Sequence, residues 1–270
     1  MTELADLLRF AVDRHADSST FACHEHRHGC DSYHATSPLL HHIGFFQSYE
    51  RYPRTVRRAV AAMPGSAVAV VGVESELSAE ALLRALPTDE RRSVTFFDRC
   101  ETPLRRIAMA SDAELARHDI LTVPADILGA QLDASFDVVF ADSFVKQFGP
   151  AQKPRVLERL AGLARSSASL LVMREYIGEL GRLLCDFWAG LPGLLERCGV
   201  RADHRLETAL AHVREYMGSA PATYRDDETF QVALACAGLR VLSYEHIASR
   251  PYAIVVASPD RPRRTARSVL

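Results

Sequence analysis

The chain has 270 residues, of which 48% are hydrophobic and 24% charged, and its formal net charge at pH 7 is −2. This length and apolar content allow one large α/β domain with additions. There is no broad positive field to attract nucleic acid. The apolar runs are too short to span a bilayer and no secretory signal opens the chain, so we expect no membrane partner and a cytoplasmic location with reduced cysteines.

The basic residues are almost all arginine. Of the 32 lysines and arginines only Lys146 and Lys153 are lysine, which leaves 30 arginines. The simplest interpretation of this bias is genome composition rather than function.

Residues 1–64 are predicted to form a helical cap that precedes the sheet. One helix is expected over residues 3–15, a second begins near Ser37, and a third covers Thr55–Met63. Such a cap would cover the mouth of a ligand crevice, or it could equally form the surface of a homodimer.

A stretch rich in cysteine and histidine separates the first two cap helices. Its candidate metal ligands are Cys23, His24, His26, His28, Cys30 and His34. Thiolates and imidazoles bind zinc, but the stretch contains no Cys-x2-Cys pair and no second pair follows downstream. We therefore predict no metal site, with a structural metal as the alternative. A polar loop or lid near a ligand pocket is favoured, with some of these histidines simply solvated. Tyr33 and His34 are the candidates to approach a ligand, and a lid histidine such as His34 could act as a base.

The sheet is organised around Val68–Val73, which reads VAVVGV. A run of Ala and Val that reaches Gly72 predicts a buried parallel strand entering a turn. The next helix is expected over Ser78–Leu86, with Ser78 as its N-cap. A second strand over Ser93–Phe97 stops at Asp98. An acid there can accept both hydroxyls of a nucleoside ribose, although a solvated strand-end acid is the alternative.

Three further strands alternate with helices along the chain. The strands are expected over 119–123, 136–140 and 169–173, and the helices over 103–116 and 150–165. Five alternations predict a doubly wound parallel sheet with helices on both faces.

The remainder of the chain adds inserted helices and a hairpin. Two amphipathic helices are expected within an insertion over 177–222, and another helix over 223–237. The strands at 239–246 and 252–257 are separated by about five residues, too few for a crossover helix, so they must be antiparallel. The predicted fold is an α/β domain over 65–258 with a mostly parallel seven-stranded sheet and a terminal hairpin. A disordered tail over 259–270 follows.

This order of elements resembles the class I S-adenosylmethionine-dependent methyltransferases over about residues 66–258. The resemblance rests on VAVVGV, TFFD at 95–98, ADI at 125–127, FDVVFADSF at 136–144 and the ending AGLRVLSYEHIASRPYAIVVAS. In that family the turn after the first strand lies against the methionine half of the cofactor, which implicates Gly72. The acid that ends the second strand holds the ribose, which implicates Asp98, with Arg99 beside it.

The resemblance also implies cofactor contacts after the third and fourth strands. It places Asp126 at the adenine amino group and Ile127 on the adenine ring. It places Asp142 and Ser143 against cofactor and substrate. From the residues alone, Asp126 could instead cap its own turn, because aspartate in a loop often bonds its own backbone.

The turn after the first strand departs from the family pattern. Where the family has a Gly-x-Gly-x-Gly type of turn, this chain has Gly72, Glu74 and Glu76. Glycines there let the backbone approach the ligand. Glu74 could face the ammonium or sulfonium of the cofactor, a favourable charge pair, or the site has decayed. Retained binding is favoured because Asp98 and Asp126 are both present.

The expected function is transfer of a methyl group from S-adenosylmethionine to a small molecule, in specialised metabolism. Such a displacement needs positioning and, for nitrogen or oxygen acceptors, a base. The candidate catalytic residues are Asp142, Tyr176 and His34, and Glu175 lies among them at the strand tips. Two alternatives stay open: an enzyme that uses the same cofactor for cyclisation or alkyl transfer, and a non-catalytic scaffold with a degenerate turn. A nicotinamide oxidoreductase is disfavoured by the hairpin and by the missing Gly-x-Gly-x-x-Gly motif.

Overall fold

The fold is described from a computed structural model of the chain. The described residues are 54–63, 67–73, 76–86, 91–109, 113–129, 132, 135–178, 190, 193, 196–197, 224–246 and 252–260. Most of the predicted cap, most of the insertion and the tail after residue 260 lie outside them.

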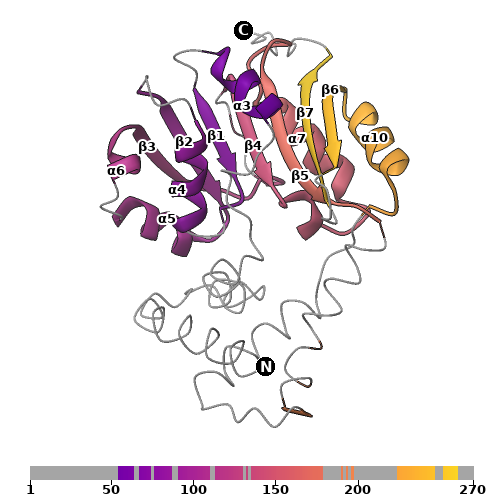
Figure 1. Cartoon of the computed structure of the whole chain (residues 1–270), viewed down its shortest axis with the longest axis horizontal. Helices are drawn as coiled ribbons and strands as arrows, with labels where there is room; N and C mark the ends of the chain where they lie inside the picture. Colours follow the sequence, from indigo (N-terminus) through magenta and orange to yellow (C-terminus); the bar gives the residue numbers. More distant parts are fainter. Residues whose placement is uncertain are drawn as a thin grey trace, which may run out of the picture.

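A twisted seven-stranded sheet forms the centre of the domain, in the order β3-β2-β1-β4-β5-β7-β6 (Figure 1). The strands are β1 (Val68–Val71), β2 (Ser93–Asp98), β3 (Asp119–Pro124), β4 (Val138–Asp142), β5 (Leu170–Tyr176), β6 (Leu239–His246) and β7 (Tyr252–Pro259). Strands β1 to β5 pair in parallel, whereas β7 runs antiparallel to both β5 and β6. The expected terminal hairpin is therefore confirmed, and its second strand lies inside the sheet.

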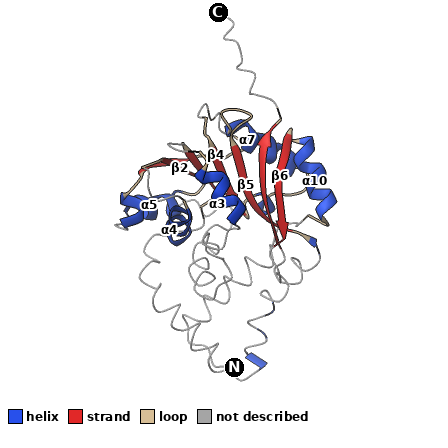
Figure 2. Ribbon diagram, turned by 45° about the horizontal axis from the view of Figure 1, so that its top comes forward, coloured by secondary structure: helices blue, strands red, loops and turns tan. Residues whose placement is uncertain are grey.

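Helices cover both faces of the sheet (Figure 2). They are α3 (Arg54–Ala61), α4 (Glu76–Ala85), α5 (Glu101–Met109), α6 (Ala113–Ala116), the 3-10 turn η4 (Val145–Gln147), α7 (Lys153–Leu163) and α10 (Asp227–Cys236). One core lies under α3 to α6 and the other under α7 and α10.

Alternation along each strand assigns residues to these two cores. In β1, Val68 and Val70 face the first core, whereas Ala69 and Val71 face the second. Successive side chains of a strand point to opposite faces, so a strand covered on both faces must be apolar throughout. This explains why VAVV is buried at every position. The doubly wound α/β fold predicted from the sequence is confirmed.

Several predicted boundaries are corrected by the structure. Ser78 is not an N-cap, because α4 begins at Glu76 and Ser78 lies within the helix. The single helix expected over 103–116 is two helices, α5 and α6, and the first begins at Glu101. Phe136 precedes β4 and forms an isolated bridge with Ala164.

Strand β5 is longer than expected at its carboxyl end. It continues to Tyr176 because β7 pairs with it as far as Tyr176↔Tyr252. All seven of its residues are buried, including Arg174 and Glu175. The antiparallel neighbour thus carries two charged residues into the interior, where they need partners.

The last helix of the predicted cap segment packs on the sheet. Val60 of α3 is 2% exposed and belongs to the first core, and Ala59 and Met63 pack against that core. Residues 1–53 lie outside the described residues. Among the helices that are described, none combines the length and apolar character required to cross a membrane.

The second core provides a test of the packing. We expect Leu157→Ala, at a position of α7 with 0% exposure, to lower the free energy of unfolding by about 2–5 kcal/mol because it leaves a cavity under the sheet. Chemical denaturation would measure this. Leu121→Ala in β3, where the side chain is 57% exposed, is the control and should change stability by only about 0.5 kcal/mol. Equal effects at the two positions would contradict the assignment of Leu157 to the core.

Candidate functional site

The carboxyl ends of β1, β2, β4 and β5 lie at one edge of the sheet and carry the polar residues singled out in the sequence. Strand β1 lies between β2 and β4, so the order of the sheet reverses there. In open α/β sheets ligands bind outside the carboxyl ends of the strands at such a switch point. This edge is therefore the candidate site.

The turn after β1 is closed by a glycine that no other residue replaces easily. Gly72 has a φ of +76°, and its N–H donates to the carbonyl of Phe97 at 2.9 Å. A side chain added at Gly72 would collide with the ring of Phe144, which follows β4. The absence of a Cβ at Gly72 thus serves the close approach of Phe144 as well as the backbone conformation.

Asp98 binds the same turn from the end of β2. Its Oδ2 accepts a hydrogen bond from the Val73 N–H at 3.0 Å, and its Oδ1 accepts one from the Cys100 N–H at 2.7 Å. Burial raises the pKa of Asp98 to about 6, against the opposing effect of these backbone hydrogen bonds. The side chain is half-buried. The Arg99 N–H also acts on this carboxylate. A carboxylate has about four acceptor positions, so three backbone donors leave capacity for a ligand hydroxyl.

Asp142 at the end of β4 forms a buried ion pair with Arg174. The guanidinium binds both carboxylate oxygens, Nε to Oδ1 and Nη2 to Oδ2, the latter at 2.7 Å. The two residues are register partners on neighbouring parallel strands. A bidentate pair of this kind fixes both side chains. Asp142 is thus engaged by protein, so its role toward a cofactor or as a base stays a prediction.

Ser143 is the only described non-glycine residue with a positive φ, at 51°. It is 2% exposed, and its N–H donates to the carbonyl of Arg174 at 2.7 Å. Residues in this conformation are strained, and such residues concentrate at functional sites. The turn that follows β4 is therefore held in shape by contacts with β5.

Glu175 and two lysines form a buried cluster beside this turn. Glu175 is 0% exposed, and its Oε1 accepts a hydrogen bond from the Val145 N–H at 2.9 Å. Burial raises its pKa to about 7, whereas the charges of Lys153 and Lys146 act in the opposite direction. Burial likewise lowers the pKa of Lys153, an effect that the charge of Glu175 opposes.

Aromatic rings cover both lysine ammonium groups. Lys146 Nζ lies 4.5 Å from the centroid of the Tyr176 ring, and Lys153 Nζ lies 4.2 Å from that of Tyr224. Such cation–π contacts stabilise a buried charge. Tyr176, a candidate catalytic residue, is 4% exposed and packs within this cluster.

The residues after β3 have mixed environments. Asp126 is exposed, and its Oδ1 accepts a hydrogen bond from the Leu128 N–H at 2.9 Å, so it caps its own turn. Ile127 is 5% exposed and belongs to the second core. Arg99 is exposed. Their expected contacts with a cofactor stay predictions, as do those of Glu74, Tyr33 and His34, which lie outside the described residues.

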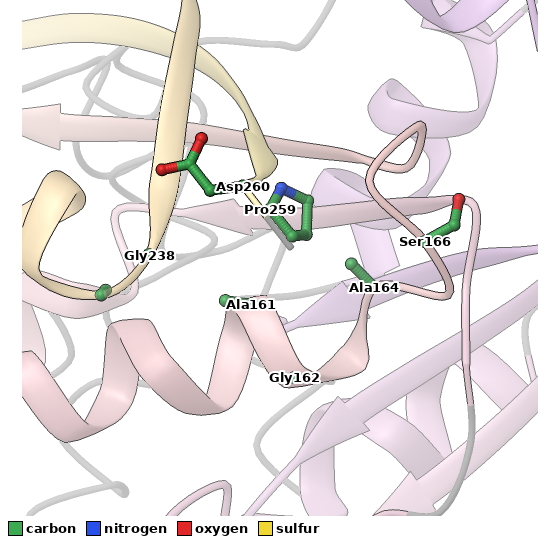
Figure 3. A pocket seen from close by; sticks show the side chains of 8 residues that line it. Ala161, Gly162, Ala164, Ser166, Gly238, Pro259 and Asp260 are labelled. Atoms are coloured by element: carbon green, nitrogen blue, oxygen red, sulfur yellow. The ribbon is translucent and has the colours of Figure 1, made fainter. Parts of the chain in front are cut away.

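A separate pocket of about 470 Å³ lies at the opposite edge of the sheet (Figure 3). Its lining comes from the end of α7, the loop after it, the turn between α10 and β6, and the end of β7: Ala161, Gly162, Ala164, Ser166, Ala237, Gly238, Pro259 and Asp260. The lining residues are mostly small, and Ser166 and Asp260 contribute polar side chains. This pocket faces the amino ends of the parallel strands, away from the candidate site at their carboxyl ends.

Comparisons with known proteins agree on the fold. No protein-family model and no curated protein matches the chain. Among solved structures, human N-acetylserotonin methyltransferase in complex with S-adenosylmethionine matches with a TM-score of 0.54 at 13% identity, over 87% of this chain and 57% of its own. The magnesium protoporphyrin IX methyltransferase of Synechocystis PCC 6803, with S-adenosylhomocysteine bound, matches with a TM-score of 0.50 at 16% identity, over 81% and 84%.

The fold is that of the class I methyltransferases. A protein from Rhodobacter sphaeroides, provisionally described as a zinc-dependent alcohol dehydrogenase, also matches, with a TM-score of 0.52 at 20% identity, over 80% of this chain and 94% of its own. Such identities establish architecture only.

Within the described part of the chain, no group of three His, Cys, Asp or Glu side chains is arranged to hold a metal ion.

The contacts of Arg174, Lys146 and Lys153 in the buried part of the site were not predicted from the sequence. The pairing of Arg174 with Asp142 depends on strand register, which the sequence does not specify. The lysines did give a signal, because they are the only two lysines in the chain. Composition explains why arginine is abundant, but it does not explain why both lysines are buried at one edge.

The Gly72 turn gives a second prediction. Gly72→Ala should lower the free energy of unfolding by roughly 2–4 kcal/mol, since it combines an unfavourable φ with a collision against Phe144. Gly162→Ala in α7 is the control, because nothing lies within 4 Å of the added methyl group. The control should be about 0.5–1 kcal/mol more stable, from helix propensity. Urea denaturation measures both variants. An unchanged free energy of unfolding for Gly72→Ala would contradict the prediction and show that the turn rearranges to accept the methyl group.

Proposed function

We propose that this protein is an S-adenosylmethionine-dependent methyltransferase that acts on a small molecule. The observation that carries the proposal is Asp98, a half-buried acid at the tip of β2 that also binds the turn after β1. The methyltransferase fold and the two enzymes described above, whose names denote small-molecule substrates, support it. The specialised-metabolism setting stays a prediction.

The residues present fit a nucleoside more clearly than they fit a methionine tail. Asp98 keeps acceptor capacity for a ligand hydroxyl, and Val73 of the neighbouring turn is already fixed to it. At Gly72, in contrast, the space of a side chain is taken by Phe144. We therefore assign the ribose to Asp98. We propose that the Phe144 ring contacts the methionine part of the ligand. When bound, S-adenosylmethionine would supply a methyl group activated by its sulfonium.

The chain's own residues would position the acceptor and remove its proton. Asp142 accepts two hydrogen bonds from Arg174, so we propose that this pair fixes the tips of β4 and β5. Tyr176 and His34 remain our candidates for the base. A non-methylating enzyme would share every one of these features. A scaffold without cofactor would explain the acids in place of glycines, and it could use Asp98 for its hydrogen bond to the turn alone, so ligand binding separates it from the enzymes.

Calorimetric titration with S-adenosylmethionine and S-adenosylhomocysteine tests the proposal. We expect binding, and we expect Asp98→Ala to weaken it by about 10- to 100-fold, the effect of losing hydrogen bonds to a charged group. Asp137→Ala is the matched control, because Asp137 Oδ2 accepts the Ala67 N–H at 2.9 Å at the other end of β1. The control should bind like wild type. A folded, ligand-free sample that binds neither compound would exclude both enzyme hypotheses.

The affinity for S-adenosylmethionine should also depend on pH. Ligand hydroxyls donate to the ionised form of Asp98, whose pKa in the unliganded protein is raised to about 6 by burial. Binding should therefore release a proton, and affinity should fall as pH is lowered through about 6. Asp98→Asn should remove this step. Titration between pH 5 and 8 measures it, and an unchanged step in the variant would assign the titration to another group.

A further inference from the structure

The two lysines of the chain are both buried beside the same carboxylate. Lys146 is 7% exposed and Lys153 is 5% exposed, whereas lysine is almost never found so deeply buried without a partner. The other 30 of the 32 lysines and arginines are arginine. Lysine is a compact point charge and arginine a broad planar fork, so the two are not equivalent in a confined site. The position of the lysines therefore indicates a local electrostatic requirement.

Glu175 is the acid that faces these lysines. It occupies the face of β5 that packs on α7, from which Lys153 extends, and Lys146 comes from η4. Its Oε1 accepts the Val145 N–H, while its Oε2 and the hydroxyl of Tyr224 are buried with no hydrogen-bond partner in the described part of the chain. A buried carboxylate with one oxygen unsatisfied is held ionised mainly by the nearby positive charges.

The net charge of this edge depends on Glu175. The neighbouring Asp142 is paired with Arg174 and adds no net charge, and burial together with the charge of Glu175 raises the pKa of Tyr224, which therefore stays neutral. With both lysines protonated, the cluster carries one net positive charge when Glu175 is ionised and two when it is protonated. Glu175 titrates near neutral pH, with a pKa of about 7.

The cluster connects directly to the candidate crevice. Val145, whose N–H Glu175 holds, follows Phe144, and the Phe144 ring lies against the Gly72 turn. Strained Ser143 precedes them. Glu175 is thus linked by the Val145 N–H to the turn whose Phe144 ring lies at this end of the candidate site.

We propose that Glu175 is a positioning residue for a cationic ligand: its carboxylate offsets the two buried lysines and allows this end of the crevice to accept a sulfonium. Affinity for the sulfonium then follows the ionisation of Glu175. The inference rests on the proposed function, because it assigns the sulfonium of S-adenosylmethionine to the edge formed by β4 and β5.

The test compares two ligands that differ in that charge. S-adenosylmethionine carries a sulfonium, whereas S-adenosylhomocysteine has a neutral thioether in its place. At pH 8, Glu175→Gln should lower affinity for S-adenosylmethionine by about five- to tenfold relative to S-adenosylhomocysteine, the effect of one charge on another in a partly buried site. The glutamine retains an oxygen that can accept the Val145 N–H. Lys153→Met should change the ratio of affinities in the opposite direction.

Glu158→Gln is the matched control, because Glu158 is an exposed glutamate of α7 and its neutralisation makes the same change of net charge. It should leave the ratio unchanged. Equal weakening of both ligands by Glu175→Gln would show a structural role only and overturn the proposal, as would an unchanged ratio. Failure of the wild-type protein to bind either ligand would instead overturn the proposed function and the inference with it.

A measurement without ligand tests the titration itself. The pKa of Glu175 in the folded protein is raised from 4.5 to about 7, so the folded state binds the extra proton between these values. The contribution of Glu175 to the free energy of unfolding should therefore decrease as pH rises through this window. In thermal unfolding from pH 5 to 8, Glu175→Gln should lack this decrease. A profile identical to wild type would overturn the predicted link between protonation and sulfonium affinity.

Discussion

The turn at Gly72 is the constraint on which the arrangement of the candidate site depends. Its backbone is bonded to β2 through Phe97 and Asp98, and its open side receives the Phe144 ring from the chain after β4. Three strand ends are thus fixed by one position without a side chain. The acid proposed to hold a ribose is fixed at the same time, because Asp98 accepts the N–H that follows the glycine. Stability and ligand geometry therefore depend on the same contacts.

Two groups of buried charged residues lie at the candidate site, an ion pair and a cluster of three. Arg174 binds both carboxylate oxygens of Asp142, which makes the pair a fixed element between β4 and β5. Glu175 and the two lysines are less completely satisfied, since one carboxylate oxygen has no donor among the described residues. The ion pair fixes the positions of the strand ends, whereas the charge of the Glu175 cluster can change near neutral pH. A fold shared by many enzymes could acquire its ligand preference from such local differences.

The positions of several site residues could be predicted from the sequence, but their interaction partners could not. Asp98 was placed by the strand that it terminates, and the structure shows it at the tip of β2 beside the first turn. For Asp126 the sequence allowed two roles, a contact with adenine or a cap of its own turn, and the structure shows the capping hydrogen bond. Asp142 could be located at a strand end from its pattern, but its partner on the next strand could not be read from the chain.

The sequence by itself determined the order of strands and helices, the burial of β1 and the antiparallel final pair. These follow from local periodicity and from the length of connections, which act within short segments. Tertiary structure alone decided the insertion of β7 between β5 and β6, the extension of β5 to Tyr176 and the gathering of Lys146, Lys153 and Glu175. Each of these depends on register and packing between segments far apart in the chain, and no local pattern specifies them.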